Sequence, residues 1–329
     1  MEKVNIYTDL AIESREMIPQ EEELDGVKIT VDEKDDSGIT VTWVEVNNEE
    51  GALRLNKPIG NYITIESEAM KETHLEIHEE IAQILAGTLN RLHKLGPDSV
   101  ILVIGLGNWQ VTPDALGPRV VSKVLVTRHI SGTGEIPAEV EGKVRSVCAI
   151  SPGVMGLTGI ETAEIVRGIA SRVKPDLLVA VDALAARKTN RINATIQISD
   201  TGVNPGAGLG NKRMAINSET IGVPVIAMGV PTVVDAATLV NDTMDKILSS
   251  MIHEAPQGSG FYEMLMNLAD EEKYHLIKEI LNPYSGNMFV TPKDVDAVMD
   301  RLSNIIANSL NMALHPGITA EDMNRYLAS

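Results

Sequence analysis

The chain is poor in several residue types, and each shortage excludes a class of protein. Of its 329 residues one is cysteine, Cys148, so no disulfide can form within the chain, and because this thiol lies in an apolar run we expect it to be buried. With two Trp and two Phe, the core must be mostly aliphatic. Basic residues number 28 against 46 acidic ones, and the net charge of −18 argues against nucleic-acid binding, since phosphate contacts need clustered Lys and Arg.

The sequence also lacks long hydrophobic runs. No segment approaches the length of a membrane span, and the N-terminal residues contain no apolar signal core. We therefore expect a cytoplasmic protein without membrane contact. Metal-ligand patterns are missing too, because Glu76, between His74 and His78, stands at the wrong offset for a zinc-protease helix and no third ligand is apparent. We expect no metal and no cofactor.

One stretch, residues 99–118, organises the expected fold. Residues 100–104 are five consecutive aliphatic residues, typical of a strand buried on both faces. Gly105 and Gly107 follow, where the backbone must turn sharply. Asp114 then stands at the expected start of a helix. It would therefore lie at the carboxyl end of a central strand, where ligands bind in open α/β sheets.

A second apolar strand, Leu177 to Val181, delivers Asp182 to an equivalent place. An aspartate at a strand end is often only a helix N-cap, but two such positions in one domain favour a function. If the two carboxyls approach, repulsion raises one pKa, so that one is protonated and one ionised near neutral pH. Such a pair can activate water and protonate a peptide carbonyl. Arg187 is an alternative partner, which would lower the pKa of a carboxyl.

The order of the elements predicts a single α/β domain with three layers, a mostly parallel sheet and helices on both faces. We expect an N-terminal β extension over residues 27–66 and C-terminal helices over about 261–329. A helix ending near Val173 is expected to begin at a capping box from Thr158 to Glu161. The strands of the parallel sheet are expected at 100–104, 144–150, 177–181 and 224–228.

Together these segments resemble the spore germination protease family of endospore-forming bacteria. The resemblance covers nearly the whole chain, from Tyr7 to His315. The segments that carry it are GLGN at 105–108, VTPDALGP at 111–118, PGVMG at 152–156, TGIET at 158–162, DALAAR at 182–187, NATIQISD at 193–200 and GVPTVVD at 229–235.

The resemblance implies an atypical aspartic-type endopeptidase, made as a homotetrameric zymogen in the developing spore, with a fold similar to that of hydrogenase maturation proteases. It implies that the enzyme degrades small acid-soluble spore proteins during germination and binds no DNA itself. Its two essential aspartates match Asp114 and Asp182 here. The residues that we expect to support catalysis or bind substrate are Gly105, Gly107, Asn108 and Arg187.

The N-terminal segment resembles the sequence that this family cuts in its substrates, T-E-F-A-S-E. Residues 8–13 read TDLAIE, with an acidic residue, a large hydrophobe, Ala, and Glu three positions after the hydrophobe. The surrounding segment is polar and unpatterned, so it can reach an active site at little structural cost. We expect self-cleavage between Asp9 and Leu10, which removes residues 1–9 as a propeptide and leaves a single peptidase domain, 10–329.

Two other functions stay open. A hydrogenase-maturation-type endopeptidase would use acidic residues and a histidine around nickel in its substrate, and His129 is the only candidate histidine in that region; activity in the presence of a chelator would separate the two. A nucleotide-binding module would use segments 105–110 and 206–212, but the first lacks the third glycine of the dinucleotide fingerprint and the second departs from P-loop spacing. A thermal-shift screen would test it, because a nucleotide at a hundred times its Kd adds about 2.7 kcal/mol.

Overall fold

One mixed sheet runs through the part of the chain that the computed structural model describes, which is residues 8–18, 24–131, 144–206, 213–254, 259–260 and 288–317. Within these residues nine strands lie in the order β1-β2-β3-β7-β8-β6-β4-β5, and β9 pairs with β8. The strands are β1 Val27–Lys34, β2 Ile39–Val46, β3 Gly60–Glu66, β4 Val100–Gly105, β5 Ser146–Ile150, β6 Leu177–Ala186, β7 Thr195–Ser199, β8 Val225–Asp235 and β9 Phe289–Val290.

Half of the sheet is parallel, as the apolar runs predicted. Strands β8, β6, β4 and β5 pair in parallel. The pairing of β4 with β6 stops at Gly105 and Val181, whereas β6 continues beside β8 as far as Ala186. The strand expected at 177–181 is therefore longer than predicted. Its second half extends beyond the end of β4, which leaves one edge of β6 open to other parts of the chain.

The other half is antiparallel and contains the expected N-terminal β extension. Strands β1, β2, β3 and β7 pair antiparallel in sequence, and β7 pairs antiparallel with β8. The extension is thus continuous with the main sheet, which makes the sheet mixed. This continuity brings residues before 70 beside the carboxyl ends of the parallel strands.

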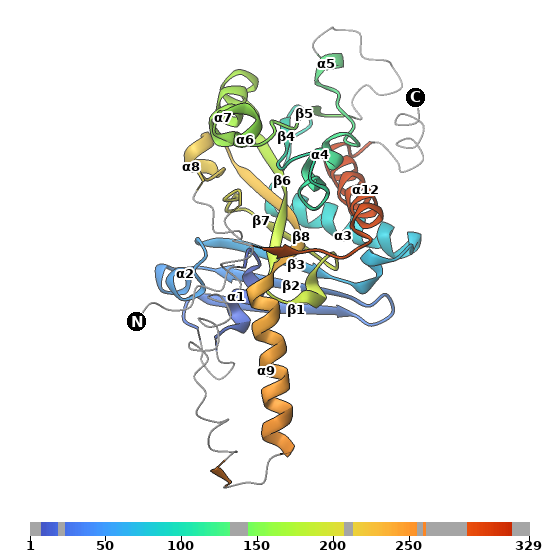
Figure 1. Cartoon of the computed structure of the whole chain (residues 1–329). Helices are drawn as coiled ribbons and strands as arrows, with labels where there is room; N and C mark the ends of the chain where they lie inside the picture. The colour runs from blue at the N-terminus through green and yellow to red at the C-terminus, as the bar shows by residue number, and fades with distance from the viewer. Residues whose placement is uncertain are drawn as a thin grey trace.

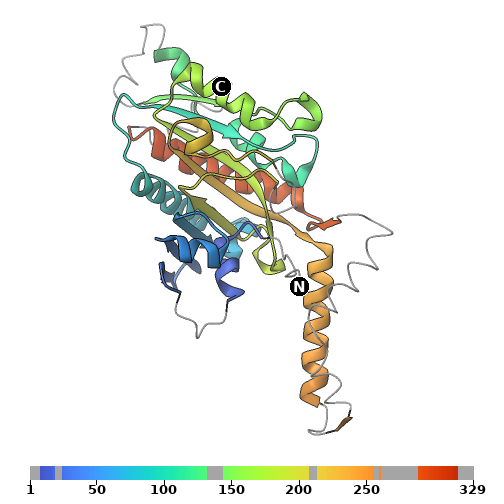
Figure 2. The same cartoon turned by 90° about the vertical axis from the view of Figure 1, so that its left-hand side faces the viewer.

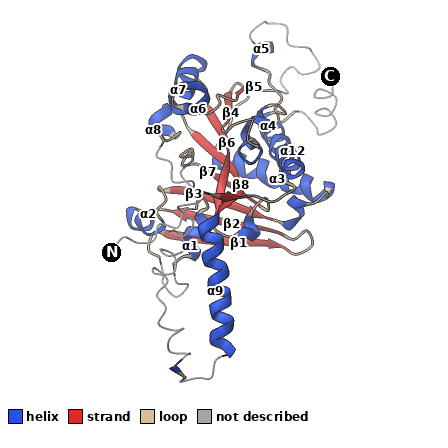
Figure 3. Cartoon of the chain, viewed as in Figure 1, coloured by secondary structure: helices blue, strands red, loops and turns tan. Residues whose placement is uncertain are grey.

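Helices cover both faces of the sheet, which confirms the three-layer α/β prediction (Figure 1, Figure 3). One face packs against α3 (Leu75–Leu92), α4 (Leu116–Val121) and α12 (Val295–Leu314), and the other against α7 (Thr162–Val173) and α8 (Ser218–Ile221). Successive side chains of β4 point to opposite faces of the sheet, which explains this division. Ile101 and Val103 belong to the first core, and Leu102 and Ile104 belong to the second. Both cores are almost entirely aliphatic.

The remaining described helices lie at the edges. They are α1 (Ala11–Glu16), α2 (Glu49–Leu55), α5 (Arg128–Ser131), α6 (Met155–Thr158) and α9 (Ala236–Glu254). Helix α9 projects away from the body of the molecule (Figure 1, Figure 2). Of the C-terminal helices expected over 261–329, α12 is described, whereas 261–287 and 318–329 lie outside the described residues. No helix in the described ranges is both long and apolar enough to span a bilayer.

The capping box predicted at Thr158 is wrong. Thr158 is the last residue of α6, and Gly159 follows it with a left-handed φ of 72° that ends the helix. The next helix begins at Thr162 with Glu161 as its N-cap and ends at Val173, as predicted. The hydroxyl of Thr158 binds the backbone of Ile160 instead of capping α7.

Candidate active site

Asp114 is held by a tight turn against the end of β4. It closes a short 3-10 helix, Thr112–Asp114, and its carbonyl oxygen accepts a hydrogen bond of 3.0 Å from the backbone N–H of Asn108. Gly107 has a left-handed φ of 112°, and a Cβ there would lie 2.0 Å from the Asp114 carbonyl oxygen. Only glycine permits this approach. The glycine after β4 therefore determines where Asp114 lies.

The same turn is fixed to the neighbouring strands. The hydroxyl of Thr232 on β8 donates to the carbonyl of Pro113 at 2.7 Å. Gly117, at the start of α4, lies so close to β6 that a Cβ would be 2.5 Å from the carbonyl oxygen of Val181. Gly105 likewise lies against the backbone of Gly117. These contacts bring Asp114 beside the residue that follows Val181, which is Asp182.

Asp182 lies inside β6, one position past the point where β4 stops pairing. It is 6% exposed, and its Oδ1 accepts a hydrogen bond of 2.9 Å from the backbone N–H of Ala183. Burial raises its pKa well above the usual range, and the nearby charges of Asp114 and Asp9 raise it further. Burial also raises the pKa of Asp114 to about 6, although the Asn108 N–H and Arg213 oppose the shift. The two predicted aspartates therefore interact, and burial favours the protonated form of each.

Arg187 does not pair with either aspartate. Its guanidinium lies 3.5 Å from the carboxylate of Asp242 on α9. The cation that acts on Asp114 is Arg213, which the sequence did not single out. Arg213 directly follows a glycine-rich segment whose residues 207–212 lie outside the described part of the chain, and no motif marks it.

The third carboxyl near Asp182 belongs to Asp9, the residue before the predicted cleavage point. Its backbone N–H donates to the carbonyl of Ala185 at 3.1 Å, and its Oδ2 accepts from the Ala185 N–H at 2.8 Å. Asp9 thus lies along the open edge of β6, three residues beyond Asp182. Leu10 is fully buried in a small apolar cluster with Leu184 and Ala186. The residues on both sides of the Asp9–Leu10 bond thus contact β6, and the Asp9 carboxylate lies close enough to Asp182 to raise its pKa.

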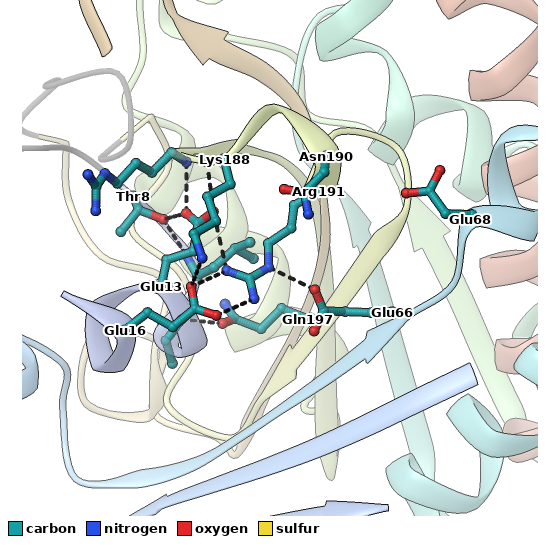
Figure 4. Close-up of polar contacts among 12 residues, drawn as sticks. Thr8, Glu13, Glu16, Glu66, Glu68, Lys188, Asn190, Arg191 and Gln197 are labelled. Carbon is teal, nitrogen blue, oxygen red and sulfur yellow. Dashed lines mark hydrogen bonds and ion pairs between the residues drawn. The ribbon is translucent and has the colours of Figure 1, made fainter. Parts of the chain in front are cut away.

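Glu13 anchors the rest of this segment. Its carboxylate, in a residue that is 1% exposed, accepts hydrogen bonds from the backbone N–H groups of Arg187 at 2.7 Å and Lys188 at 2.9 Å. It also accepts from the Thr8 hydroxyl and lies 3.5 Å from the guanidinium of Arg191. Figure 4 shows Thr8, Lys188 and Arg191 around the glutamate. Residues 187–191 therefore hold the carboxylate of the fourth residue after the Asp9–Leu10 bond.

Arg191 joins this anchor to the sheet and to α1. Its Nη atoms donate to both carboxylate oxygens of Glu16 at 2.7 Å, and its Nε donates to Glu66 on β3 at 2.7 Å (Figure 4). Hydrogen bonds to the two glutamates raise the pKa of the guanidinium above its usual value, although burial opposes the shift. Two-point pairing of this kind fixes orientation as well as charge.

Two further contacts hold the Asp9–Leu10 bond itself, and sequence reasoning missed both. Lys57 Nζ donates to the Asp9 carbonyl oxygen at 2.9 Å, and Gln197 Nε2 donates to the same oxygen at 3.1 Å. Both residues, with Asp9 and Leu184, line a cavity of about 790 Å³. Among the described residues no group of three or more His, Cys, Asp or Glu side chains is arranged to hold a metal ion.

Comparison of the sequence with known proteins identifies the family to which the chain belongs. The sequence model of the germination protease family matches residues 7–261 and 250–327. A germination protease of Clostridium tetani is 49% identical over 326 residues, which cover 98% of this chain and 100% of that protein. One from Bacillus pumilus is 42% identical over 360 aligned residues, covering 98% of this chain and 96% of that protein.

A solved structure, the NiFe hydrogenase maturation protease HycI of Thermococcus kodakarensis, matches 64% of this chain and 92% of its own at 17% identity, with a TM-score of 0.31. The family model and the curated relatives span nearly the full chain and agree on one assignment. The protein belongs to the germination protease family and is a peptidase.

Proposed function

We propose that this protein is an aspartic-type endopeptidase made as a zymogen, which cleaves its own Asp9–Leu10 bond and then small acid-soluble spore proteins during germination. The observation that supports the proposal is that Asp9 and Leu10 are held against β6 in the manner of a bound peptide, with the Asp9 carboxylate close enough to Asp182 to raise its pKa. Residues 1–9 are then a propeptide, and 10–329 form the peptidase.

The two aspartates have different protonation states in this mechanism. Asp114, with its pKa near 6, is mostly ionised at neutral pH, whereas the more strongly shifted Asp182 keeps its proton. The Asp114 carboxylate takes a proton from water as the water oxygen bonds to the Asp9 carbonyl carbon. Asp182 gives its proton to the Leu10 nitrogen as the carbon–nitrogen bond breaks. One carboxyl acts as general base and the other as general acid.

The contacts of residues 9–13 support a substrate class. The Ala185 N–H binds the Asp9 carboxylate, Leu184 and Ala186 surround Leu10, and backbone N–H groups bind Glu13. A substrate peptide that presents an acidic residue, a large apolar residue, a small residue and then a glutamate matches these contacts in the same order.

For assembly we propose a homotetramer that binds no nucleic acid. An apolar stripe on the projecting helix α9 supports self-association, because its residues are exposed at spacings of four, three and four: Val240, Met244, Ile247 and Met251. Light scattering should give a tetramer at micromolar concentration, and a monomer would contradict this assignment.

The test of the catalytic proposal is self-processing of the purified full-length chain. Intact-mass spectrometry and N-terminal sequencing should find a product that begins Leu10-Ala11-Ile12. The Asp182→Asn variant should stay unprocessed under the same conditions. Processing of that variant at the wild-type rate, with no other protease present, would overturn the aspartic mechanism.

A further inference from the structure

The carbonyl oxygen of Asp9 accepts two side-chain hydrogen bonds, from Lys57 at 2.9 Å and Gln197 at 3.1 Å. Neither donor belongs to the pair of aspartates. Both are ordinary hydrogen-bond distances to the ground-state carbonyl oxygen, which is the atom on which negative charge develops when water attacks the carbonyl carbon. This oxygen belongs to the carbonyl of the bond that we propose is cut.

Lys57 is brought here by the end of α2. Asn56 caps that helix in a left-handed conformation, and the backbone N–H of Lys57 donates to Ala52 at 3.1 Å. The Lys57 ammonium then reaches the carbonyls of Thr8, at 3.4 Å, and Asp9. Burial lowers the pKa of this ammonium, while the carboxylates of Asp9 and Glu13 raise it and favour the charged form.

Gln197 is oriented by a second contact. It is buried on β7, and its Oε1 accepts a hydrogen bond of 2.7 Å from the backbone N–H of Ala11. Because a backbone N–H can only donate, the amide nitrogen must face the other way, toward Asp9. One side chain therefore holds the peptide on both sides of the Asp9–Leu10 bond.

We propose that Lys57 and Gln197 are catalytic residues that stabilise the oxyanion formed on the Asp9 carbonyl during cleavage. As water attacks the carbon and its proton passes to Asp114, the carbonyl electron pair moves onto this oxygen, which both donors hold. When the carbonyl re-forms, the carbon–nitrogen bond breaks and Leu10 takes its proton from Asp182. Neither aspartate then needs to protonate the carbonyl oxygen. Asp114 accepts the proton from water, and Asp182 donates a proton to the leaving amine.

The inference rests on the proposed self-cleavage, but an experiment can disprove the oxyanion role of Lys57 and Gln197 while self-cleavage itself is observed. A purely structural Lys57 would hold residues 8–16 in place without lowering the barrier. The two roles differ in a measurable way: loss of an oxyanion donor slows cleavage while the segment stays docked, whereas loss of an anchor slows cleavage because the segment leaves.

The experiment compares first-order self-processing of full-length wild type, Lys57→Met, Gln197→Leu and Lys28→Met by intact mass. Lys28 is the matched control, since it pairs with Glu45 on the exposed face of β1 and β2. We expect Lys57→Met to slow cleavage by about 10²–10³-fold and Gln197→Leu by a smaller factor, with Lys28→Met unchanged. Lys57→Gln, which removes the charge but leaves a polar side chain, replaces Lys57→Met if the latter does not fold.

Docking is measured by hydrogen–deuterium exchange over residues 8–16 in uncleaved proteins, comparing Asp182→Asn with Asp182→Asn/Lys57→Met. Equal protection with slow cleavage supports the oxyanion role. Lost protection, or cleavage of Lys57→Met at the wild-type rate while Asp182→Asn is arrested, overturns it and leaves the self-cleavage proposal standing. Absence of wild-type cleavage at Asp9–Leu10 overturns both.

Discussion

The two halves of the sheet contribute different things to the site. The parallel half supplies both aspartates, from a turn after β4 and from β6, and its aliphatic surroundings raise their pKa values. The antiparallel half and its connections supply Lys57 before β3 and Gln197 on β7, which bind the Asp9 carbonyl oxygen. They also supply Glu66, which binds Arg191 and through it Glu13 and Glu16. The parallel half thus supplies the two carboxyls with raised pKa values and, through β6, further contacts with the segment, whereas the antiparallel half supplies contacts with the segment only. Substitution of the aspartates and substitution of the residues that hold the segment should therefore slow self-processing in different ways.

The largest effect is expected in the parallel half. Asp182→Asn should slow self-processing by about 10⁴-fold, because an amide of the same shape cannot give the leaving amine its proton. Exchange protection of residues 8–16 should be unchanged, since Lys57, Ala185, Arg187, Lys188, Arg191 and Gln197 make the hydrogen bonds and ion pair that hold that segment. The measurement is intact mass against time at neutral pH.

Asp36→Asn, in the exposed turn between β1 and β2, is the matched control and should process at the wild-type rate. If Asp182→Asn loses protection of residues 8–16 as well as activity, the separation between the two aspartates and the groups that hold the segment is wrong.

An intermediate effect is expected where the peptide is anchored. Glu13→Gln replaces a carboxylate that accepts two backbone N–H bonds and faces Arg191, and such charged hydrogen bonds contribute about 1.5–3 kcal/mol. Cleavage should slow roughly 10–100-fold, with exchange over residues 8–16 rising in parallel. Glu164→Gln, on the exposed face of α7, should change neither quantity. If Glu13→Gln cleaves slowly but residues 8–16 keep their full protection from exchange, Glu13 does not anchor the segment.

The sequence predicted the parallel half far better than the antiparallel one. Asp114 and Asp182 follow recognisable apolar runs, and a carboxyl after such a run is a visible signal. The prediction ended the second strand at Val181, with the apolar run from Leu177, but pairing with β8 carries β6 through Asp182 to Ala186.

Lys57 and Gln197 had no comparable signal. A lysine before a proline and a glutamine in an alternating strand are ordinary residues in ordinary places. Their role depends on docking of residues 8–13, and the Gln197 contact with Ala11 joins positions 186 residues apart. Long-range contacts of this kind follow from the order of strands in the sheet, which local patterns do not specify.

A smaller effect concerns stability in the parallel half. Because the pKa of Asp114 rises from 3.8 to about 6 on folding, the native state binds more protons than the unfolded state across that interval. Its contribution to stability is complete below pH 3.8 and is lost as pH rises through 6. Asp114→Asn should therefore gain stability relative to wild type by about 2 kcal/mol between pH 4 and pH 8, after allowance for partial exposure. Denaturant melts at the two pH values measure it, and a constant difference would contradict the shift.

The smallest expected effect is on the pH dependence of self-processing. It distinguishes Arg213 from Arg187 as the cation that acts on Asp114, which the sequence did not decide. Arg213 lowers the pKa of Asp114, whereas the Arg187 guanidinium pairs with Asp242. If ionised Asp114 is the general base, processing should slow as pH falls below about 6, and Arg213→Gln should move that limb to higher pH by up to about half a unit, the size of a partly exposed charge pair. Arg187→Gln keeps the backbone N–H that binds Glu13, so the limb should stay where it is. A shift in the Arg187 variant and none in the Arg213 variant would reverse the assignment and make Arg187 the cation that tunes the dyad.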